Sequence, residues 1–216
     1  MPINKKMNLS DKALSTPELA PTRDGFGKGL LEAGEKNERV VGLCADLTES
    51  VRMHWFAQKF PQRFFQVGVA EQNLAGVAAG LALEGKIPFA SSFGVFSPGR
   101  NWDQIRVSIC YSNANVKIAS SHTGLTVGQD GATHQALEDV AIMRVLPGMT
   151  VLVPCDFIET KKATLAAAEL NGPVYLRFGR EKTPVVTTEQ TSFEIGKAQV
   201  FYEGADVSII ACGIMT

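Results

Sequence analysis

Short runs of apolar and β-branched residues alternate with longer helical segments along most of this chain, and this alternation constrains the fold most strongly. The runs have the length of buried strands, and they stand at residues 39–44, 64–67, 87–92, 115–121, 150–154 and 173–178. Because strands covered on both sides are typical of parallel sheets, the pattern predicts an α/β fold. We expect a doubly wound, mostly parallel sheet with helices on both faces.

Helices are expected between these strands, at residues 24–37, 51–60, 70–85, 101–112, 135–146 and 156–171. The segment 70–85, AEQNLAGVAAGLALEG, is rich in alanine and glycine and small on every face. Small side chains let another helix or strand approach closely. We therefore expect this helix to be buried, and it is the segment where self-association would occur.

The chain divides into a polar arm at 1–22, a main domain at 23–180, a charged linker at 181–195 and a last segment at 196–216. We expect the arm to be flexible. In the last segment, ADVSIIACG (205–213) has the composition of a first strand of another α/β domain. We therefore expect that third domain to be truncated.

The composition excludes several classes of protein. With 21 basic and 22 acidic side chains, the formal charge of −1 provides no general field to attract nucleic acid or anionic lipid. No apolar run has the length of a membrane span, and the amino end lacks the apolar core of a signal peptide, so we expect a cytoplasmic protein. Neither disulfides nor a zinc site is expected from the four widely spaced cysteines, Cys44, Cys110, Cys155 and Cys212.

Ligands of parallel sheets collect at the carboxyl ends of the strands, so the loops that follow the strands are the candidate site. Four of these loops are unusual, at residues 45–50, 68–73, 91–101 and 120–135. Together they contain two of the three histidines, several carboxylates and two closely spaced phenylalanines. Such mixtures are typical of active-site loops.

Glu71 begins the most apolar helix, where the helix dipole favours a carboxylate but neighbouring side chains keep water away. Taken singly, Glu71 is best explained as a helix-start carboxylate, and Phe93 and Phe96 as core side chains. His122 and His134 flank a glycine-rich loop with Asp130 between them, which fits a polar substrate site or a solvated loop equally well.

Motifs for nucleotides and metals are absent from the sequence. There is no GxGxxG or GxxxxGK[ST] pattern, and the histidines lack HxH or HxxxH spacing, so no metal site is predicted. GQDG at 128–131 lacks the downstream asparagine of a metal-diphosphate motif. Isolated arginines such as Arg177 usually contribute no more than solubility.

Taken together and in order, the motifs from Arg23 to Pro184 resemble the pyrimidine-binding domain of transketolases and, more distantly, deoxyxylulose-phosphate synthases. The resemblance rests on four blocks, GLCADLTES, FQVGVAEQNLAGVAAGLA, VGQDGATHQALEDVAIMRVLPGMTVLVP and GPVYLRFGREKTP. An ordered set of this kind is far more specific than any single motif. It implies thiamine diphosphate as the cofactor.

The resemblance also implies roles for individual residues. Glu71 would be catalytic and would hydrogen-bond the aminopyrimidine ring of the cofactor. The other cofactor-binding residues would be Phe93, Phe96, Asp46, Leu47 and Arg100. Arg100 stands where many transketolases have a further aromatic residue. His134 would be a second catalytic residue, and the substrate would be held by Arg23, Ser50, His122, Asp130, His134 and Arg180.

By the same resemblance, the activity would be transfer of a two-carbon ketol unit from a ketose phosphate to an aldose acceptor. Full-length transketolases place a diphosphate-binding domain before this one, whereas only about twenty polar residues precede Arg23. The resemblance therefore implies a separate amino-terminal subunit that holds the diphosphate and Mg²⁺. This chain would be inactive alone and would form a dimer within a heterotetramer.

Three other interpretations stay open at this stage. The chain could belong to a deoxyxylulose-phosphate synthase or to a 2-oxo acid dehydrogenase of the β-subunit type. The implied phosphate-binding residues favour a sugar phosphate over a 2-oxo acid. A non-catalytic transketolase-like binding protein is the third possibility, and retention of Glu71, both phenylalanines and both loop histidines argues against it.

Overall fold

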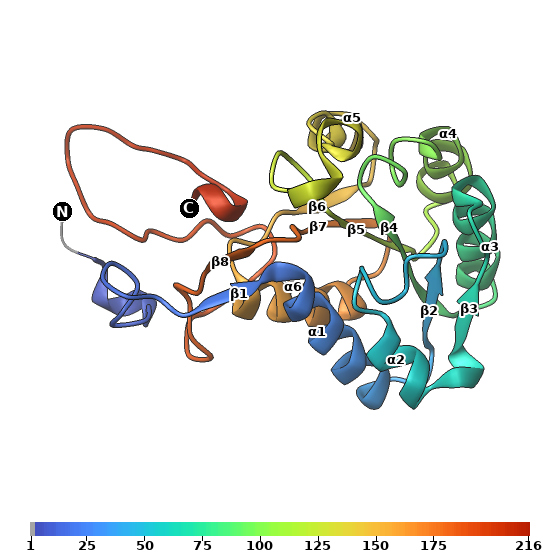
Figure 1. The fold of residues 1–216 in the computed structure, drawn as a ribbon, viewed down its shortest axis with the longest axis horizontal. Coiled ribbons are helices and arrows are strands. Elements are labelled where there is room, and N and C mark those ends of the chain that lie inside the picture. The colour runs from blue at the N-terminus through green and yellow to red at the C-terminus, as the bar shows by residue number, and fades with distance from the viewer. Residues whose placement is uncertain (1–2) are drawn as a thin grey trace.

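A computed structural model describes residues 3–216 and places a six-stranded sheet at the centre of the chain (Figure 1). Its strands are β2 (Val40–Cys44), β3 (Phe64–Gln66), β4 (Ile87–Phe93), β5 (Lys117–Ser121), β6 (Thr150–Leu152) and β7 (Val174–Arg177). All neighbours run parallel, in the order β3-β2-β4-β5-β7-β6. The central strands β2, β4 and β5 are buried along their whole length, in keeping with the apolar sequence of β2. Strands β4 and β5 also bury serine side chains, and β5 buries Lys117.

Helices cover both faces of the sheet, as predicted. One face is covered by α1 (Thr22–Lys36), α2 (His54–Lys59) and α6 (Phe157–Glu169), which lie side by side in the lower middle of Figure 1. The other face is covered by α3 (Glu71–Leu83), α5 (Asp139–Arg144) and the short α4 (Trp102–Gln104), which continues into a π-helical segment at Ile105–Tyr111. The predicted α/β fold class is confirmed.

Glycines bring α1 and α6 into close contact. A Cβ atom at Gly25 would overlap the carbonyl oxygen of Phe157, and one at Gly29 would lie 2.7 Å from the Cβ of Thr164. Larger residues at these positions would therefore separate the helices. The close packing fixes the amino end of α1, which carries Arg23 toward the carboxyl edge of the sheet.

A second, two-stranded sheet joins residues that lie far apart in the sequence. Strand β1 (Leu19–Pro21) pairs antiparallel with β8 (Lys182–Pro184). Beside this pair, the amide of Gly179 donates a hydrogen bond of 2.8 Å to Oγ1 of Thr22. The pairing brings the start of α1 next to the loop that follows β7. Arg23 and Arg180 therefore come from opposite ends of the sequence to the same region.

The segment 205–213, which has the composition of a first strand, is irregular in the described chain. Val207, Ile209 and Ile210 are exposed, and no strand ladder forms in this segment of the described chain. Figure 1 shows the segment as a wide loop beside the amino-terminal arm, where Asn4 donates a backbone hydrogen bond to Phe201. An apolar run becomes a strand only where a neighbouring strand accepts its hydrogen bonds.

Helix α3 is only half buried in this chain, whereas the sequence led us to expect a buried helix. Leu74, Ala75, Ala78 and Ala79 face the sheet and are buried. Gly76 and Gly80 lie on the opposite side, where an added Cβ atom would meet nothing within 4 Å. One face of α3 is therefore free of contacts within residues 3–216.

Among residues 3–216, every helix is too short or too polar to cross a membrane.

Candidate active site

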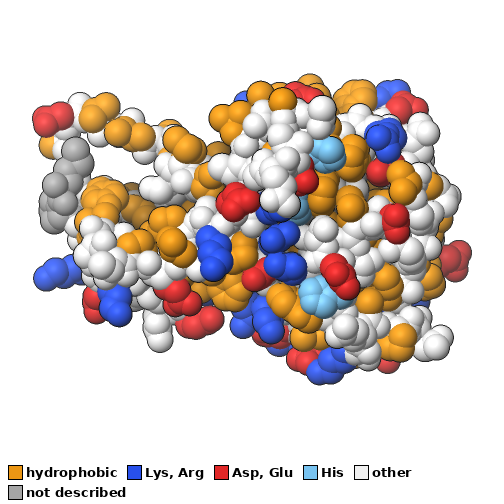
Figure 2. Space-filling view, viewed as in Figure 1, with side chains coloured by type: hydrophobic (Ala, Val, Ile, Leu, Met, Phe, Trp, Pro, Cys, Tyr) orange, Lys and Arg blue, Asp and Glu red, His pale blue; other side chains and the backbone are white. Residues whose placement is uncertain are grey.

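The predicted site residues gather at the carboxyl edge of the sheet. The strand order reverses direction between β2 and β4, because β3 lies beyond β2 whereas β5 lies beyond β4. Loops leave such a reversal point in opposite directions and open a crevice between them. In Figure 2, basic side chains (blue) lie next to histidine side chains (pale blue) near the middle of the molecular surface.

Glu71 lies at the start of α3, and its side chain is only 2% exposed. Its Oε2 accepts a hydrogen bond of 2.7 Å from Nη1 of Arg100, whose side chain is half exposed. The amino end of the helix and the guanidinium both stabilise a negative charge at this position. The pair joins the loop after β3 to the loop after β4.

Asn101 forms hydrogen bonds that connect the same two loops. Sequence reasoning did not single out this residue. It is 1% exposed, and its Nδ2 donates hydrogen bonds to the carbonyl oxygen of Glu71 at 2.9 Å and to Oγ of Ser97 at 3.2 Å. Because Asn101 follows Arg100 directly, the backbone of this short segment is held against the first turn of α3. The only sequence signal was an asparagine inside an already unusual loop.

Two phenylalanines and two histidines form an aromatic cluster, which the guanidinium of Arg100 links to Glu71. The rings of Phe93 and Phe96 are nearly parallel, with centroids 6.1 Å apart. His122 stacks on Phe93 with centroids 3.7 Å apart, and His134 meets the edge of Phe96 at 5.5 Å. The cluster unites the ends of β4 and β5 with the glycine-rich loop. Phe93 is buried and Phe96 is half buried, so the cluster extends from the core toward the crevice.

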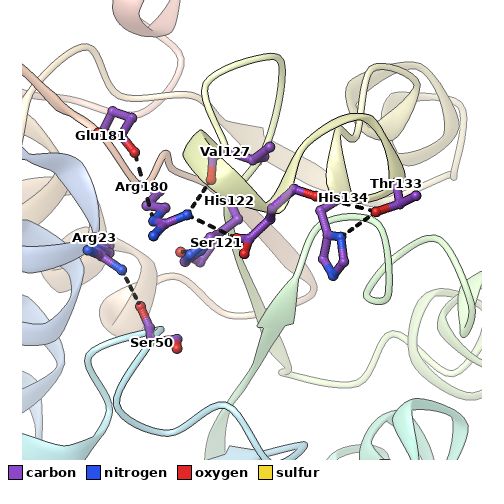
Figure 3. A network of polar contacts seen from close by, with 10 residues as sticks. Arg23, Ser50, Ser121, His122, Val127, Thr133, His134, Arg180 and Glu181 are labelled. Atoms are coloured by element: carbon purple, nitrogen blue, oxygen red, sulfur yellow. Dashed lines mark hydrogen bonds and ion pairs between the residues drawn. The ribbon is translucent and has the colours of Figure 1, made fainter.

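His122 is the most deeply buried histidine of the site. It is 2% exposed, has a φ of 56°, and its Nδ1 lies 2.8 Å from Oγ of Ser121 (Figure 3). Burial, followed by the positive charges of Arg23 and Arg180, lowers the pKa of His122 from its ordinary value of 6.5 to about 3. The imidazole is therefore neutral at physiological pH.

Arg23 lies at the start of α1 and points toward the loop that follows β2. Its Nη1 donates a hydrogen bond of 3.1 Å to the carbonyl oxygen of Ser50, as Figure 3 shows. Its Nε is buried and has no hydrogen-bond partner. Burial, followed by the charge of Arg52, lowers the pKa of Arg23. Arg52, which sequence reasoning missed, has a φ of 66° and forms an ion pair of 2.6 Å with Asp24.

Arg180 reaches the glycine-rich loop from the end of β7. Its Nη1 donates hydrogen bonds to the carbonyl oxygen of Val127 at 2.5 Å and to Oδ2 of Asp130 at 3.1 Å. A more distant contact of 3.8 Å joins it to Glu181. Figure 3 shows these contacts, together with His134, whose Nδ1 lies 2.8 Å from Oγ1 of Thr133. Arg180 thus orders the loop that carries both histidines.

Asp46 and Leu47 are the two predicted residues that the structure does not join to the others. Asp46 is exposed with a φ of 58°, and Leu47 packs against the core beneath the first face of the sheet. The amide of Asp46 donates a hydrogen bond of 2.7 Å to Oε1 of Gln66. Both residues lie in the loop that follows β2.

The arrangement can bind two kinds of chemical group. A buried carboxylate beside aromatic rings suits a flat nitrogen heterocycle that donates hydrogen bonds. A group of arginines with an unpartnered buried Nε suits an anion. These features lie at the reversal point of a parallel sheet, where a crevice can accept a flat heteroaromatic ring and an anion.

Comparison with known proteins identifies the family. Residues 19–186 match the family model described as the transketolase pyrimidine-binding domain, and this chain belongs to that family. A solved structure titled as a split-gene transketolase in an inactive β4 tetramer superimposes with a TM-score of 0.82 at 51% identity, over 90% of this chain and 62% of that one.

Two curated relatives are similar over nearly the same region. One, from Methanocaldococcus jannaschii, is provisionally named a transketolase C-terminal section and is 50% identical over 88% of this chain and 61% of its own length. The other is a 6-deoxy-6-sulfo-D-fructose transketolase subunit, SqwH, from Clostridium sp. strain MSTE9, at 44% identity over 89% of this chain and 60% of its own length. The chain spans about three fifths of these relatives.

Proposed function

We propose that this chain is the pyrimidine-binding subunit of a thiamine-diphosphate-dependent transketolase. Together with a separate diphosphate-binding subunit, it transfers a two-carbon ketol unit from a ketose phosphate to an aldose acceptor. The observation that carries the proposal is the buried carboxylate of Glu71 at the start of α3, which accepts an N–H from the guanidinium that lies over the ring of Phe96.

The residues present fit the aminopyrimidine end of this cofactor. The guanidinium of Arg100 is planar and donates N–H groups, and it already lies over the ring of Phe96 at 4.9 Å while it bonds Glu71. A flat ring of similar polarity therefore finds the same aromatic face and the same acceptor. This fit concerns the pyrimidine end alone, because the sequence lacks a metal-diphosphate motif.

When bound, thiamine diphosphate supplies a thiazolium ring that stabilises a carbanion. Glu71 shares a proton with the pyrimidine ring nitrogen and so sets the tautomer of the amino group. Burial supports this role because water cannot compete for the proton. Phe93 and Phe96 pack against the pyrimidine, and Asp46 and Leu47 contribute the crevice wall after β2.

The substrate binds at the arginine-rich end of the crevice. Arg23 and Arg180 hold the phosphate of the sugar, and the unpartnered Nε of Arg23 supports this assignment. Neutral His122 forms hydrogen bonds to sugar hydroxyl groups, and half-buried His134 exchanges protons with them. Asp130 and Ser50 complete the site. The relative named for a sulfonated sugar also handles a substrate with an anionic end.

The partner arrangement rests on the split nature of the relatives. We place the diphosphate and its Mg²⁺ on a separate amino-terminal subunit, and the cofactor between unlike subunits. Two copies of each subunit then form a heterotetramer, in which the exposed face of α3 with Gly76 and Gly80 contacts the second copy of this chain. We expect the assembly to act in the cytoplasm.

Calorimetric titration tests the proposal directly. Thiamine diphosphate with Mg²⁺ is titrated into this chain, into the diphosphate-binding subunit and into their mixture. We expect saturable binding and ketol transfer from a ketose phosphate only in the mixture, because each subunit supplies one end of the cofactor site. Tight binding by this chain alone, or a mixture that binds cofactor without transferring a ketol unit, contradicts the proposal.

A further inference from the structure

The half-exposed side chain of Arg100 contacts both a carboxylate and an aromatic ring. Its Nη1 bonds Oε2 of Glu71 at 2.7 Å, and its guanidinium carbon lies 4.9 Å from the centroid of the Phe96 ring. The guanidinium is thus a flat, N–H-donating group with an aromatic ring on one face and a buried carboxylate at its edge. These are the contacts that an aminopyrimidine ring needs.

We propose that the Arg100 side chain occupies the pyrimidine subsite of the cofactor-free chain and is displaced when the cofactor binds. The inference rests on the proposed function and adds to it a residue that competes with the ligand. Without a partner, the buried carboxylate of Glu71 has to lose water with no compensation. Arg100 supplies the compensation until the cofactor takes its place.

The exposure of the two side chains supports displacement. Glu71 is 2% exposed and starts a packed helix, so it cannot leave the site, whereas Arg100 is 50% exposed and can turn into solvent. The backbone beneath Arg100 is held separately by Asn101, whose Nδ2 bonds the carbonyl oxygen of Glu71. The side chain of Arg100 can therefore move while its loop stays in place.

A matched control exists on the same segment. Arg106 is 52% exposed, forms an ion pair of 3.0 Å with Asp103, and lies 5.8 Å from the centroid of the Trp102 ring. It therefore has the same kinds of contact as Arg100, but with an exposed carboxylate outside the candidate site. Arg106→Met therefore shows how much the melting temperature changes when an arginine of this type is removed and Glu71 keeps its partner.

The first measurement is the melting temperature of the cofactor-free chain with and without Arg100→Met. We expect Arg100→Met to lower the melting temperature by several degrees in the chain with Glu71, because a buried carboxylate is left uncompensated. In the Glu71→Gln background, Arg100→Met and Arg106→Met should each change the melting temperature little. An equal effect of Arg100→Met in both backgrounds contradicts the inference.

The second measurement is the Kd of the two-subunit complex for thiamine diphosphate with Mg²⁺. A contact that is lost on binding opposes binding, so Arg100→Met should lower the Kd, by roughly three- to tenfold. An unchanged or higher Kd overturns the inference and leaves the proposed function intact. If neither the wild-type nor the variant complex binds the cofactor, the proposed function fails and this inference fails with it.

Discussion

His122 lies face to face with Phe93, with ring centroids 3.7 Å apart and an angle of 19° between the planes. The stacked imidazole is closed off from water, and the charges of Arg23, Arg180, His134 and Arg52 oppose a further positive charge there. Both effects disfavour protonation, and desolvation is the larger of them.

The first prediction is a pH dependence of stability. Because the pKa of His122 is about 3 in the folded chain against an ordinary value of 6.5, the unfolded chain binds more protons between these values. The free energy of unfolding should therefore fall as the pH decreases from 6.5 toward 3. His122→Asn should flatten this part of the curve. Denaturant titrations at several pH values measure the effect, and an imidazole resonance of His122 that titrates near pH 6.5 contradicts it.

The second prediction concerns the anionic end of the substrate. Arg180→Met in the two-subunit complex should raise the KM for a phosphorylated acceptor by roughly 10- to 150-fold, since a charge-assisted hydrogen bond contributes about 1.5–3 kcal/mol. The KM for an unphosphorylated acceptor should change little. Lys182→Met, which removes an exposed charge nearby on β8, is the control. Equal loss with both acceptors means that Arg180 only orders the loop through Val127 and Asp130.

The third prediction concerns the positioning of α3. Asn101→Asp removes the Nδ2 donor to the carbonyl oxygen of Glu71 and buries a charge beside it. We expect the free energy of unfolding to fall by at least about 2 kcal/mol. Asn73→Asp, an isosteric change at an exposed position in the first turn of α3, should be neutral or slightly stabilising because the helix dipole favours it. Equal effects in the two variants contradict the positioning role.

The fourth prediction concerns self-association. Gly76→Trp should leave the single chain folded, because Gly76 faces open space and most residues form helices better than glycine. It should shift the assembly toward monomer in sedimentation velocity. The control is Gly204→Trp, which places the same side chain in open space far along the sequence from α3. A Gly76→Trp chain that associates like wild type places the contact between copies elsewhere.

The main sheet could be predicted because its strands are short β-rich runs set between helical segments, and β2 is an unbroken apolar run of this kind. The segment 205–213 is equally apolar but forms no strand in the described chain, which offers no strand to pair with it. The half-exposed α3 was missed. Small residues such as Gly76 show that a close approach is possible, but not which surface makes it.

The candidate site was predicted in part. The loops that follow the strands were identifiable because parallel strands bring their carboxyl ends to one edge. The ion pair of Glu71 and Arg100 was not, since its members are 29 positions apart and belong to different loops. Arg52 was missed for a local reason: its φ of 66° turns the side chain toward Asp24, and an arginine in the sequence carries no sign of that backbone.

The central claim is that the carboxyl group of Glu71 shares a proton with the pyrimidine of the cofactor. Glu71→Gln keeps the shape of the side chain but cannot share that proton. The variant should fold and assemble as wild type does, with equal or slightly higher stability, because a buried ionisable group is removed. Glu84→Gln, at the exposed carboxyl end of the same helix, is the matched control.

Hydrogen–deuterium exchange at the C2 position of the cofactor, measured in the two-subunit complex, tests this claim most directly. The exchange reports removal of the C2 proton before any sugar takes part. We predict that Glu71→Gln slows it by roughly two or more orders of magnitude, the scale expected for loss of a positioned acid–base group, while Glu84→Gln leaves it unchanged. Exchange in Glu71→Gln as fast as in wild type would contradict the account and reduce Glu71 to a helix-start carboxylate.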